Sequence, residues 1–337
     1  MAALRGLTVV VLALAGGCSH LGSAEGHRFE ADEGQFHCAR AAMGKDSPYR
    51  MPLAGEEVDP ALAVQLQQLP PQARRAALAA GLEPLLAHLL ARREANADDL
   101  PGRAVLAGTE ELNLRLQAFH AQLSAAAFEA GCTADMIQKQ LAEQAELEHH
   151  RQTNIAVASV AVGALSGVVA GVWGLADRHS DGPAILAIAG GAAGTVLGAA
   201  ALTHRDWSAS FHHARNRLTP LWTGADPDHL YPTFVFRMLT LPGGIDGRSP
   251  RDELLSTWRD RIARSFPAMR VDAVRDLLLG EGGIYDEDLM TLRAEMFEGL
   301  ESAVHGVARD LELLERSLVR VLTGPPAPPP GPARTSR

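Results

Sequence analysis

The sequence predicts an all-α protein, a helical bundle whose long helices flank a central apolar helical hairpin. Aromatic residues make up only 5% of the 337 residues, and the dominance of alanine and leucine among the apolar residues favours helix over sheet. Long segments repeat apolar residues every three or four positions, the period of a helix face. Two uncharged stretches, residues 155–176 and 182–203, lie in the middle of the chain with only residues 177–181 between them.

These features predict a series of six regions. In order, they are a signal peptide (1–17), a lipid-anchored flexible tether (18–59), an N-terminal helical region (60–154), the apolar hairpin (155–203), a C-terminal helical region (204–324) and a disordered proline-rich tail (325–337). The tether is polar and poor in aliphatic residues, so it lacks the apolar side chains for a core of its own.

The N-terminal helical region is expected to contain three helices. A short helix over residues 60–69 ends at Pro70 and Pro71, and a second helix with a stripe of leucines continues to about Asn96. Thr109 is placed to cap a long helix with two glutamates in its first turn. Gly131 is a point at which this long helix can kink or break.

The C-terminal helical region opens with an expected short helix over residues 205–218, ended by Pro220. Residues 232–239 are compatible with a strand and with a buried helix, because so short an apolar run does not distinguish them. A helix is expected from Ser249–Pro250 to Phe266 and another over residues 271–279, followed by a glycine-rich loop.

The last helix, residues 286–322, carries an apolar stripe that predicts a bundle or coiled-coil element. The stripe must be buried against the body's own helices, a second copy or a partner. Its ten positions are Leu289, Leu292, Met296, Leu300, Val304, Val307, Leu311, Leu314, Leu318 and Val321.

The two uncharged stretches are each long enough to span a bilayer, which takes about 20 apolar residues. Both carry small residues at every fourth position, so one helix face lacks large side chains and two backbones can touch there, as in a glycine zipper. These helix-packing positions are Ser159, Gly163, Gly167 and Gly171 in the first stretch, and Gly190, Gly194 and Gly198 in the second. A buried alanine-rich hairpin inside a soluble bundle is the alternative.

The N-terminus resembles the signal peptide and lipobox of bacterial lipoproteins. Arg5 precedes an apolar segment, Leu7–Leu14, and small residues lead directly to Cys18. The resemblance covers about twenty residues and departs from the usual pattern at Ala15, where leucine is common. It implies a diacylated Cys18 and, with Ser19 next, a lipid anchor in the outer membrane facing the periplasm. Ordinary signal cleavage is the alternative.

The net charge limits the classes of macromolecule that the protein is expected to bind, and the cysteine content limits its disulfide pairing. The formal net charge of -9 disfavours nucleic acid. If Cys18 is lipidated, Cys38 and Cys132 remain, and export to an oxidising compartment favours a disulfide between them. Two unpaired thiols, with Cys132 buried in a helix, are the alternative.

Histidines and acidic residues flank the hairpin. In an antiparallel hairpin, His149, His150 and His204 approach Glu146 and Glu148 at one membrane boundary, and imidazole with carboxylate suits zinc or copper. The spacing matches no standard zinc motif, so no metal or other cofactor is expected, and these histidines are only minor candidates. Their titration would make the belt sensitive to pH.

The chain contains no G-x-S-x-G, H-E-x-x-H, Walker A or G-x-G-x-x-G motif, so no enzymatic activity, catalytic residue or small-molecule substrate is predicted. The sequence instead favours an envelope lipoprotein that acts as a helical scaffold or protein-interaction module, with membrane lipid, envelope proteins or its own copies as partners. A membrane-active pore former and a histidine-rich periplasmic metal or pH sensor are the alternatives.

Overall fold

The computed structural model describes residues 29–32, 38, 69–95, 103–176, 192, 195, 208–213, 215–243 and 247–323. Helices dominate this part of the chain, which confirms the all-α prediction. The chain divides into two compact units. The first comprises residues 1–31, 137–210 and 284–291, and the second comprises residues 32–136, 211–283 and 292–337.

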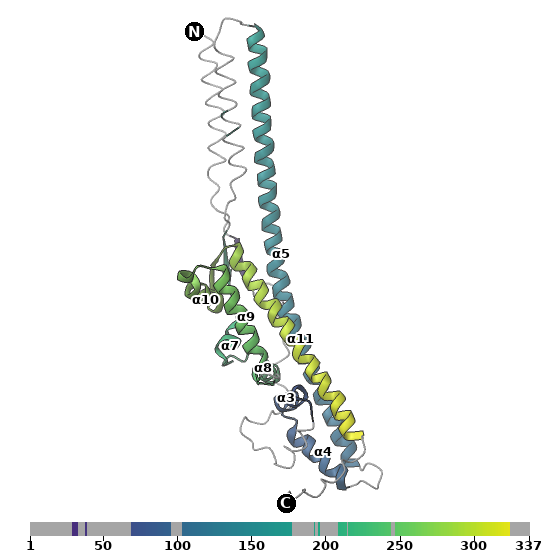
Figure 1. Cartoon of the computed structure of the whole chain (residues 1–337). Coiled ribbons are helices and arrows are strands. Elements are labelled where there is room, and N and C mark those ends of the chain that lie inside the picture. The colour runs from purple at the N-terminus through teal and green to yellow at the C-terminus, as the bar shows by residue number, and fades with distance from the viewer. Residues whose placement is uncertain are drawn as a thin grey trace, which may run out of the picture. The chain divides into compact units, whose positions relative to one another are not determined.

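Figure 1 shows the described elements along the chain. The helices are α3 (Pro71–Ala80), α4 (Glu83–Ala95), α5 (Arg103–Ala176), α7 (Leu218–Thr223), α8 (Thr233–Thr240), α9 (Pro250–Ser265), α10 (Val271–Leu279) and α11 (Glu287–Thr323). The strands β1 (Phe29–Asp32), β2 (Ala209–His212) and β3 (Gly282–Tyr285) form one sheet in the order β1-β2-β3. The short helix expected over residues 60–69 lies almost wholly outside the described residues, as does the proline-rich tail.

One helix was expected between Pro71 and Asn96, but the structure has two. Gly81 ends α3 in the left-handed conformation, with φ 57°, and its N–H bonds back to carbonyls of the last turn. A glycine adopts this conformation without the steric cost that a Cβ imposes. The leucine stripe therefore continues on α4 after a change of direction rather than along a single helix.

The long helix α5 starts earlier than expected, at Arg103, and passes through Gly131 without a break. Within the second unit, α11 runs antiparallel to this part of α5, because His120 pairs with Glu315 and Gly131 faces Glu301 (Figure 1). A Cβ at position 131 would come within 2.7 Å of the Glu301 carboxylate. Gly131 thus provides room for a neighbouring side chain rather than a kink.

The apolar stripe of α11 is buried within the protein's own fold. Nine of its ten predicted positions, from Leu289 to Leu318, are at most 5% exposed. The side chain of the tenth, Val321, lies outside the described residues. On α5 the facing core includes Leu116, Phe119 and Leu123. The choice left open by the sequence is decided in favour of a packed bundle helix.

The ambiguous segment before residue 241 is a helix. Phe234, Val235, Met238 and Leu239 are all buried in α8, a spacing of one, three and one that places them on one helix face. The Phe119 and Phe234 rings stack with centroids 4.2 Å apart. Contact with α5 therefore selects helix over strand, and α8 packs against both α3 and α9.

The start of α9 follows the sequence closely. Ser249 accepts a hydrogen bond from the Asp252 N–H, and the Asp252 carboxylate accepts one from the Ser249 N–H, which completes a capping box. The Ser249 hydrogen bonds lower the pKa of Asp252. Phe266–Pro267 ends the helix as expected, and α10 matches the predicted residues 271–279.

The helix expected over residues 205–218 is wrong. Residues 209–212 form β2, and Pro220 lies inside the short helix α7 instead of after a helix. Ala209 and Phe211 are buried and alternate with more exposed neighbours, the period of a strand. Strand β1 likewise occupies part of the segment predicted as a flexible tether. Four-residue strands are too short for their pattern to stand out in a sequence.

Glycine explains the approach of β2 to β3. Gly282 has φ 99°, and a Cβ there would come within 2.1 Å of the Phe211 carbonyl oxygen. Only a residue without a side chain lets the two backbones approach this closely. The glycine-rich run predicted as a loop therefore contributes its second half to a strand.

Candidate functional site

The helix α5 changes character along its length. Its middle part carries polar and charged residues that pair along the surface, as Lys139 does with Glu143 at 3.9 Å and His150 with Glu146 at 3.6 Å. Exposed pairs of this kind contribute little stability and are typical of a surface in contact with water. From Ile155 to the end of the helix at Ala176 there is no charged residue.

The uncharged part of α5 exposes six large apolar side chains. Each is at least half exposed, namely Val157, Val160, Leu165, Val168, Val169 and Val172. Among the described helices, α5 is the one long and apolar enough to cross a membrane, with a mean hydropathy of 1.5 over its best window and no buried residue in that window. At ~1.5 Å per residue the stretch is about 33 Å long, close to the thickness of a bilayer core. A continuous apolar surface of this size marks a site of contact with lipid or protein.

The predicted helix-packing positions are only partly described. Ser159 and Gly163 are half-buried, Gly167 is exposed, and Gly171 belongs to α5. The Ser159 hydroxyl donates to the Ala156 carbonyl, so it is used within its own helix. Gly190, Gly194 and Gly198 lie outside the described residues. Packing of the two stretches against each other therefore stays a prediction.

The histidines beside the apolar stretch do not form a described metal site. The rings of His149 and His150 lie 6.4 Å apart on α5, and His204 lies outside the described residues. In the part of the chain that the structure describes, no three His, Cys, Asp or Glu residues gather into a group that could hold a metal ion. Their convergence with Glu146 and Glu148 across a hairpin stays a prediction.

Cys38 and Cys132 form a disulfide, the pairing that the sequence favours. Their Cα atoms are 5.8 Å apart, across a sequence separation of 94 residues. The bridge attaches the N-terminal segment to α5, and Cys38 is almost fully buried. Cys18, the predicted lipidation site, lies outside the described residues.

A buried ion pair that the sequence analysis missed lies near this disulfide. Glu129 of α5 and Arg217, just before α7, approach to 2.6 Å, and Arg217 also donates to the Leu230 carbonyl. The Tyr231 hydroxyl donates to the Arg217 carbonyl, and the guanidinium lies over the Tyr231 ring. Burial lowers the pKa of Arg217, an effect that the charge of Glu129 opposes, and burial raises the pKa of Tyr231. The feature of the sequence that could have indicated this pair is a glutamate, Glu129, inside the alanine-rich buried face of α5.

A second buried polar group surrounds the end of α10. The His213 Nδ1–H donates to the Gly280 carbonyl at 2.8 Å, and Arg293 donates to the Leu278 carbonyl at 3.0 Å. The Arg293 guanidinium also lies over the Phe211 ring. Burial, and then the charge of Arg293, lower the pKa of His213 to about 3, so its imidazole is neutral near pH 7. Both side chains donate hydrogen bonds to carbonyls at the end of α10 that have no partner within the helix, so their role is structural.

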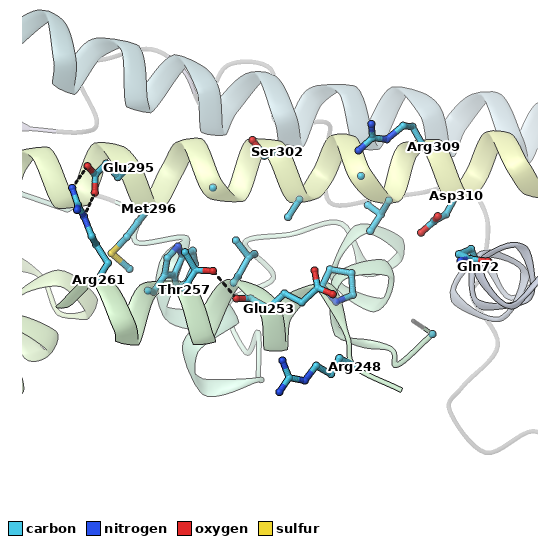
Figure 2. Close-up of a pocket in the computed structure, with 18 of the residues that line it drawn as sticks. Gln72, Arg248, Glu253, Thr257, Arg261, Glu295, Met296, Ser302, Arg309 and Asp310 are labelled. Atoms are coloured by element: carbon cyan, nitrogen blue, oxygen red, sulfur yellow. Dashed lines mark hydrogen bonds and ion pairs between the residues drawn. The ribbon is translucent and has the colours of Figure 1, made fainter. Parts of the chain in front are cut away.

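The described residues form a cleft between α9 and α11, near α3, with a volume of about 710 Å³ (Figure 2). We refer to it as the α9–α11 cleft. One end is bounded by an ion pair between Arg261 and Glu295, and the other by an ion pair between Arg75 and Asp310. Its remaining lining residues are Gln72, Gly243, Arg248, Pro250, Glu253, Leu254, Thr257, Trp258, Arg264, Leu292, Met296, Gly299, Ser302, Ala303, Gly306, Val307 and Arg309.

Sequence reasoning did not identify this cleft. Its signal lay in α11, where Gly299, Ala303 and Gly306 interrupt a helix that is otherwise rich in leucine and charge. The described lining residues include apolar side chains and arginines but no histidine or cysteine. An apolar lining with arginines suits recognition of an apolar body with a charged end.

Comparison of the chain with protein-family models, with curated proteins and with solved structures found no match.

Proposed function

We propose that this protein is a non-enzymatic, membrane-anchored helical scaffold of the bacterial envelope. The exposed, uncharged end of α5 carries the proposal, because about 33 Å of apolar helix surface is unfavourable in water and matches the thickness of a bilayer core. The lipobox-like sequence before Cys18 supports the same setting, since two acyl chains give a stable anchor. The second unit, a packed bundle with a disulfide, is the part that would hold or position partners.

Lysine substitutions in the apolar stretch test the membrane contact directly. In Val160→Lys/Val168→Lys, two charges enter positions that are more than 60% exposed, so folding of the protein should not change. Each charge near the centre of a spanning helix costs about 2.5–3.5 kcal/mol. We expect the wild type to float with liposomes in a density gradient and the double variant to remain at the bottom.

Gln152→Lys is the matched control, because it adds a charge to the same helix just before the apolar stretch. It should float like the wild type. Equal flotation of the double variant and the wild type would refute insertion of this stretch. If the wild type releases dye encapsulated in liposomes and the double variant does not, the pore-forming alternative would be favoured over a scaffold.

The lipid anchor is tested in cells by fractionation of the wild type and Cys18→Ala. The wild type should be found in the membrane fraction with an acylated N-terminus by mass spectrometry. An unmodified cysteine, or cleavage at another residue, would leave the α5 stretch as the sole support for membrane attachment.

A further inference from the structure

The α9–α11 cleft has the size of a small amphiphile. If each non-hydrogen atom takes the ~30 Å³ share of a water molecule, its volume of about 710 Å³ holds roughly two dozen atoms. A helix about 10 Å in diameter needs roughly 420 Å³ per turn, so fewer than two turns would fit. The space therefore suits one acyl chain with its head group better than a helix of a partner or a lipid with two chains.

The walls of the cleft are apolar and its floor is partly bare backbone. Leu254, Trp258, Met296 and Val307 line it from α9 and α11 and are nearly fully buried. A Cβ placed on Gly306 would meet no atom within 4 Å, so there is open space directly beside the α11 backbone. Wall and floor together form an apolar channel along this part of α11.

The rim of the cleft is positively charged. Five arginines line it against three carboxylates, although the protein as a whole has a net charge of -9. The carboxylates of Glu295 and Asp310 are engaged by Arg261 and Arg75 at the two ends. The other lining arginines are Arg264, Arg309 and Arg248, which interacts with Asp252, and the other lining carboxylate is that of Glu253. The excess of guanidinium groups complements an anion, for which arginine provides two parallel donors.

A buried donor beside the channel points to a ligand as well. Trp258 is 3% exposed, and its indole N–H has no hydrogen-bond partner among the described residues. It lies 3.5 Å from the position that a Cβ on Gly299 would occupy, next to the floor of the cleft. Buried polar groups are nearly always paired, so an unpaired donor here indicates space for an acceptor that the described residues do not supply.

We propose that the α9–α11 cleft binds a single-chain anionic lipid, a long-chain fatty acid. Its tail lies along α11 past Gly299 and Gly306, and its carboxylate is held by the arginine rim. This inference does not depend on membrane insertion by α5, because Val160→Lys/Val168→Lys changes the apolar stretch and leaves the cleft intact.

The experiment is a calorimetric titration of the delipidated full chain with palmitate below its micellar concentration. We expect saturable binding of one palmitate per chain, with at least tenfold weaker binding of monopalmitoylglycerol, which has the same chain and no charge. Hexadecylamine, with the opposite charge, should not saturate the site. Equal binding of all three probes would refute recognition of an anion.

Two substitutions at Gly306 test the location. Gly306→Phe places a ring in the open space and should weaken palmitate binding at least tenfold, while the melting temperature stays the same or rises because glycine is a poor helix former. Gly306→Ala is the matched control, since it gains the same helix propensity but fills little volume, and it should bind nearly as the wild type does. Unchanged binding by a folded Gly306→Phe variant would place the lipid elsewhere.

The rim is tested with Arg309→Gln, which removes one guanidinium from an exposed position. Palmitate affinity should fall about tenfold, in line with the loss of a charged hydrogen bond, while binding of monopalmitoylglycerol should not change. A proportional loss for both probes would mean that Arg309 does not recognise the carboxylate. Binding of palmitate by Val160→Lys/Val168→Lys should match the wild type, which separates the cleft from the membrane stretch.

Discussion

Glu129 of α5 and Arg217 before α7 form an ion pair of 2.6 Å in which both side chains are more than 90% buried. Removing one partner leaves a buried charge without its counterion, which costs about 3–5 kcal/mol. Glu129→Leu should therefore lower the free energy of unfolding by that amount, measured by urea denaturation followed by circular dichroism.

Two further variants complete this test. Glu129→Leu/Arg217→Met removes both charges and should recover part of the loss, because an apolar pair of similar volume needs no counterion. Glu143→Leu breaks an exposed pair with Lys139 and should change stability by less than about 1 kcal/mol. If Glu129→Leu is as mild as Glu143→Leu, the buried pair does not stabilise the bundle.

His213 makes stability depend on pH in the acidic range. Its folded-state pKa of about 3 lies below the usual 6.5, so between these values the unfolded chain binds a proton that the folded chain does not. The contribution of His213 is complete above pH 6.5 and is lost as the pH falls towards 3. Two pH units inside this window correspond to about 2.7 kcal/mol.

The measurement compares unfolding of the wild type and His213→Asn at pH 7 and pH 4.5. Other groups titrate in both proteins and lower the free energy of unfolding of each between pH 7 and pH 4.5. The difference between the two decreases therefore reports on His213, and the wild type should show the larger decrease. His212→Asn, at the exposed neighbouring position, should behave like the wild type. Parallel losses in all three proteins would show that His213 is accessible to protons in the fold.

The Cys38–Cys132 disulfide closes a long loop, because the two cysteines have a sequence separation of 94. In the chain-entropy model such a bridge stabilises the fold by up to ~4.7 kcal/mol. Dithiothreitol should lower the melting temperature of the wild type and leave that of Cys38→Ser/Cys132→Ser unchanged. Two freely alkylated thiols in the native protein would contradict the bridge.

Leu311 lies in the buried stripe of α11 and is fully buried. Leu311→Asp places a carboxylate in an apolar site and should cost about 4 kcal/mol or more. Glu312→Lys, one residue further, loses a surface pair with Arg316 at 3.2 Å and should cost less than about 1 kcal/mol. Thermal unfolding distinguishes the two, and a Leu311→Asp protein that melts like the wild type would mean that this part of α11 is not packed.

The predicted glycine zipper is tested at Gly167. Gly167→Leu puts a large side chain on the face where two backbones are expected to touch, so it should weaken helix packing or self-association in detergent, measured by analytical ultracentrifugation. Val169→Leu adds a similar side chain off that face and should have no effect. Equal effects of the two changes would make the glycine spacing incidental.

Structural features that many residues encode in one repeating pattern could be predicted from the sequence. The α11 stripe repeats its step over ten positions, and the burial of nine of them follows from the helix period alone. The start of α9 was equally readable, because Ser249, Pro250 and Asp252 act within a single turn. The pairing of Cys38 with Cys132 was predicted from the expectation that Cys18 is lipidated and the chain exported, which leaves two cysteines.

Features made of few residues far apart in the chain were not predictable. The four-residue strand β2 was predicted as a helix, since its alternation is too short to compete with helical composition. The α9–α11 cleft combines two helices with Arg75 of α3, and no local pattern connects them.

The sequence by itself determined the all-α class, the uncharged stretch that ends α5 and the amphipathic period of α11, because composition and periodicity are local properties. Only the tertiary structure decided that Gly131 faces Glu301 instead of kinking a helix, that α8 is a helix against Phe119, and that Glu129 meets Arg217. The physical reason is that each of these depends on which distant side chain occupies the neighbouring space. That choice is made by packing of the whole core, in which local preference is only one contribution.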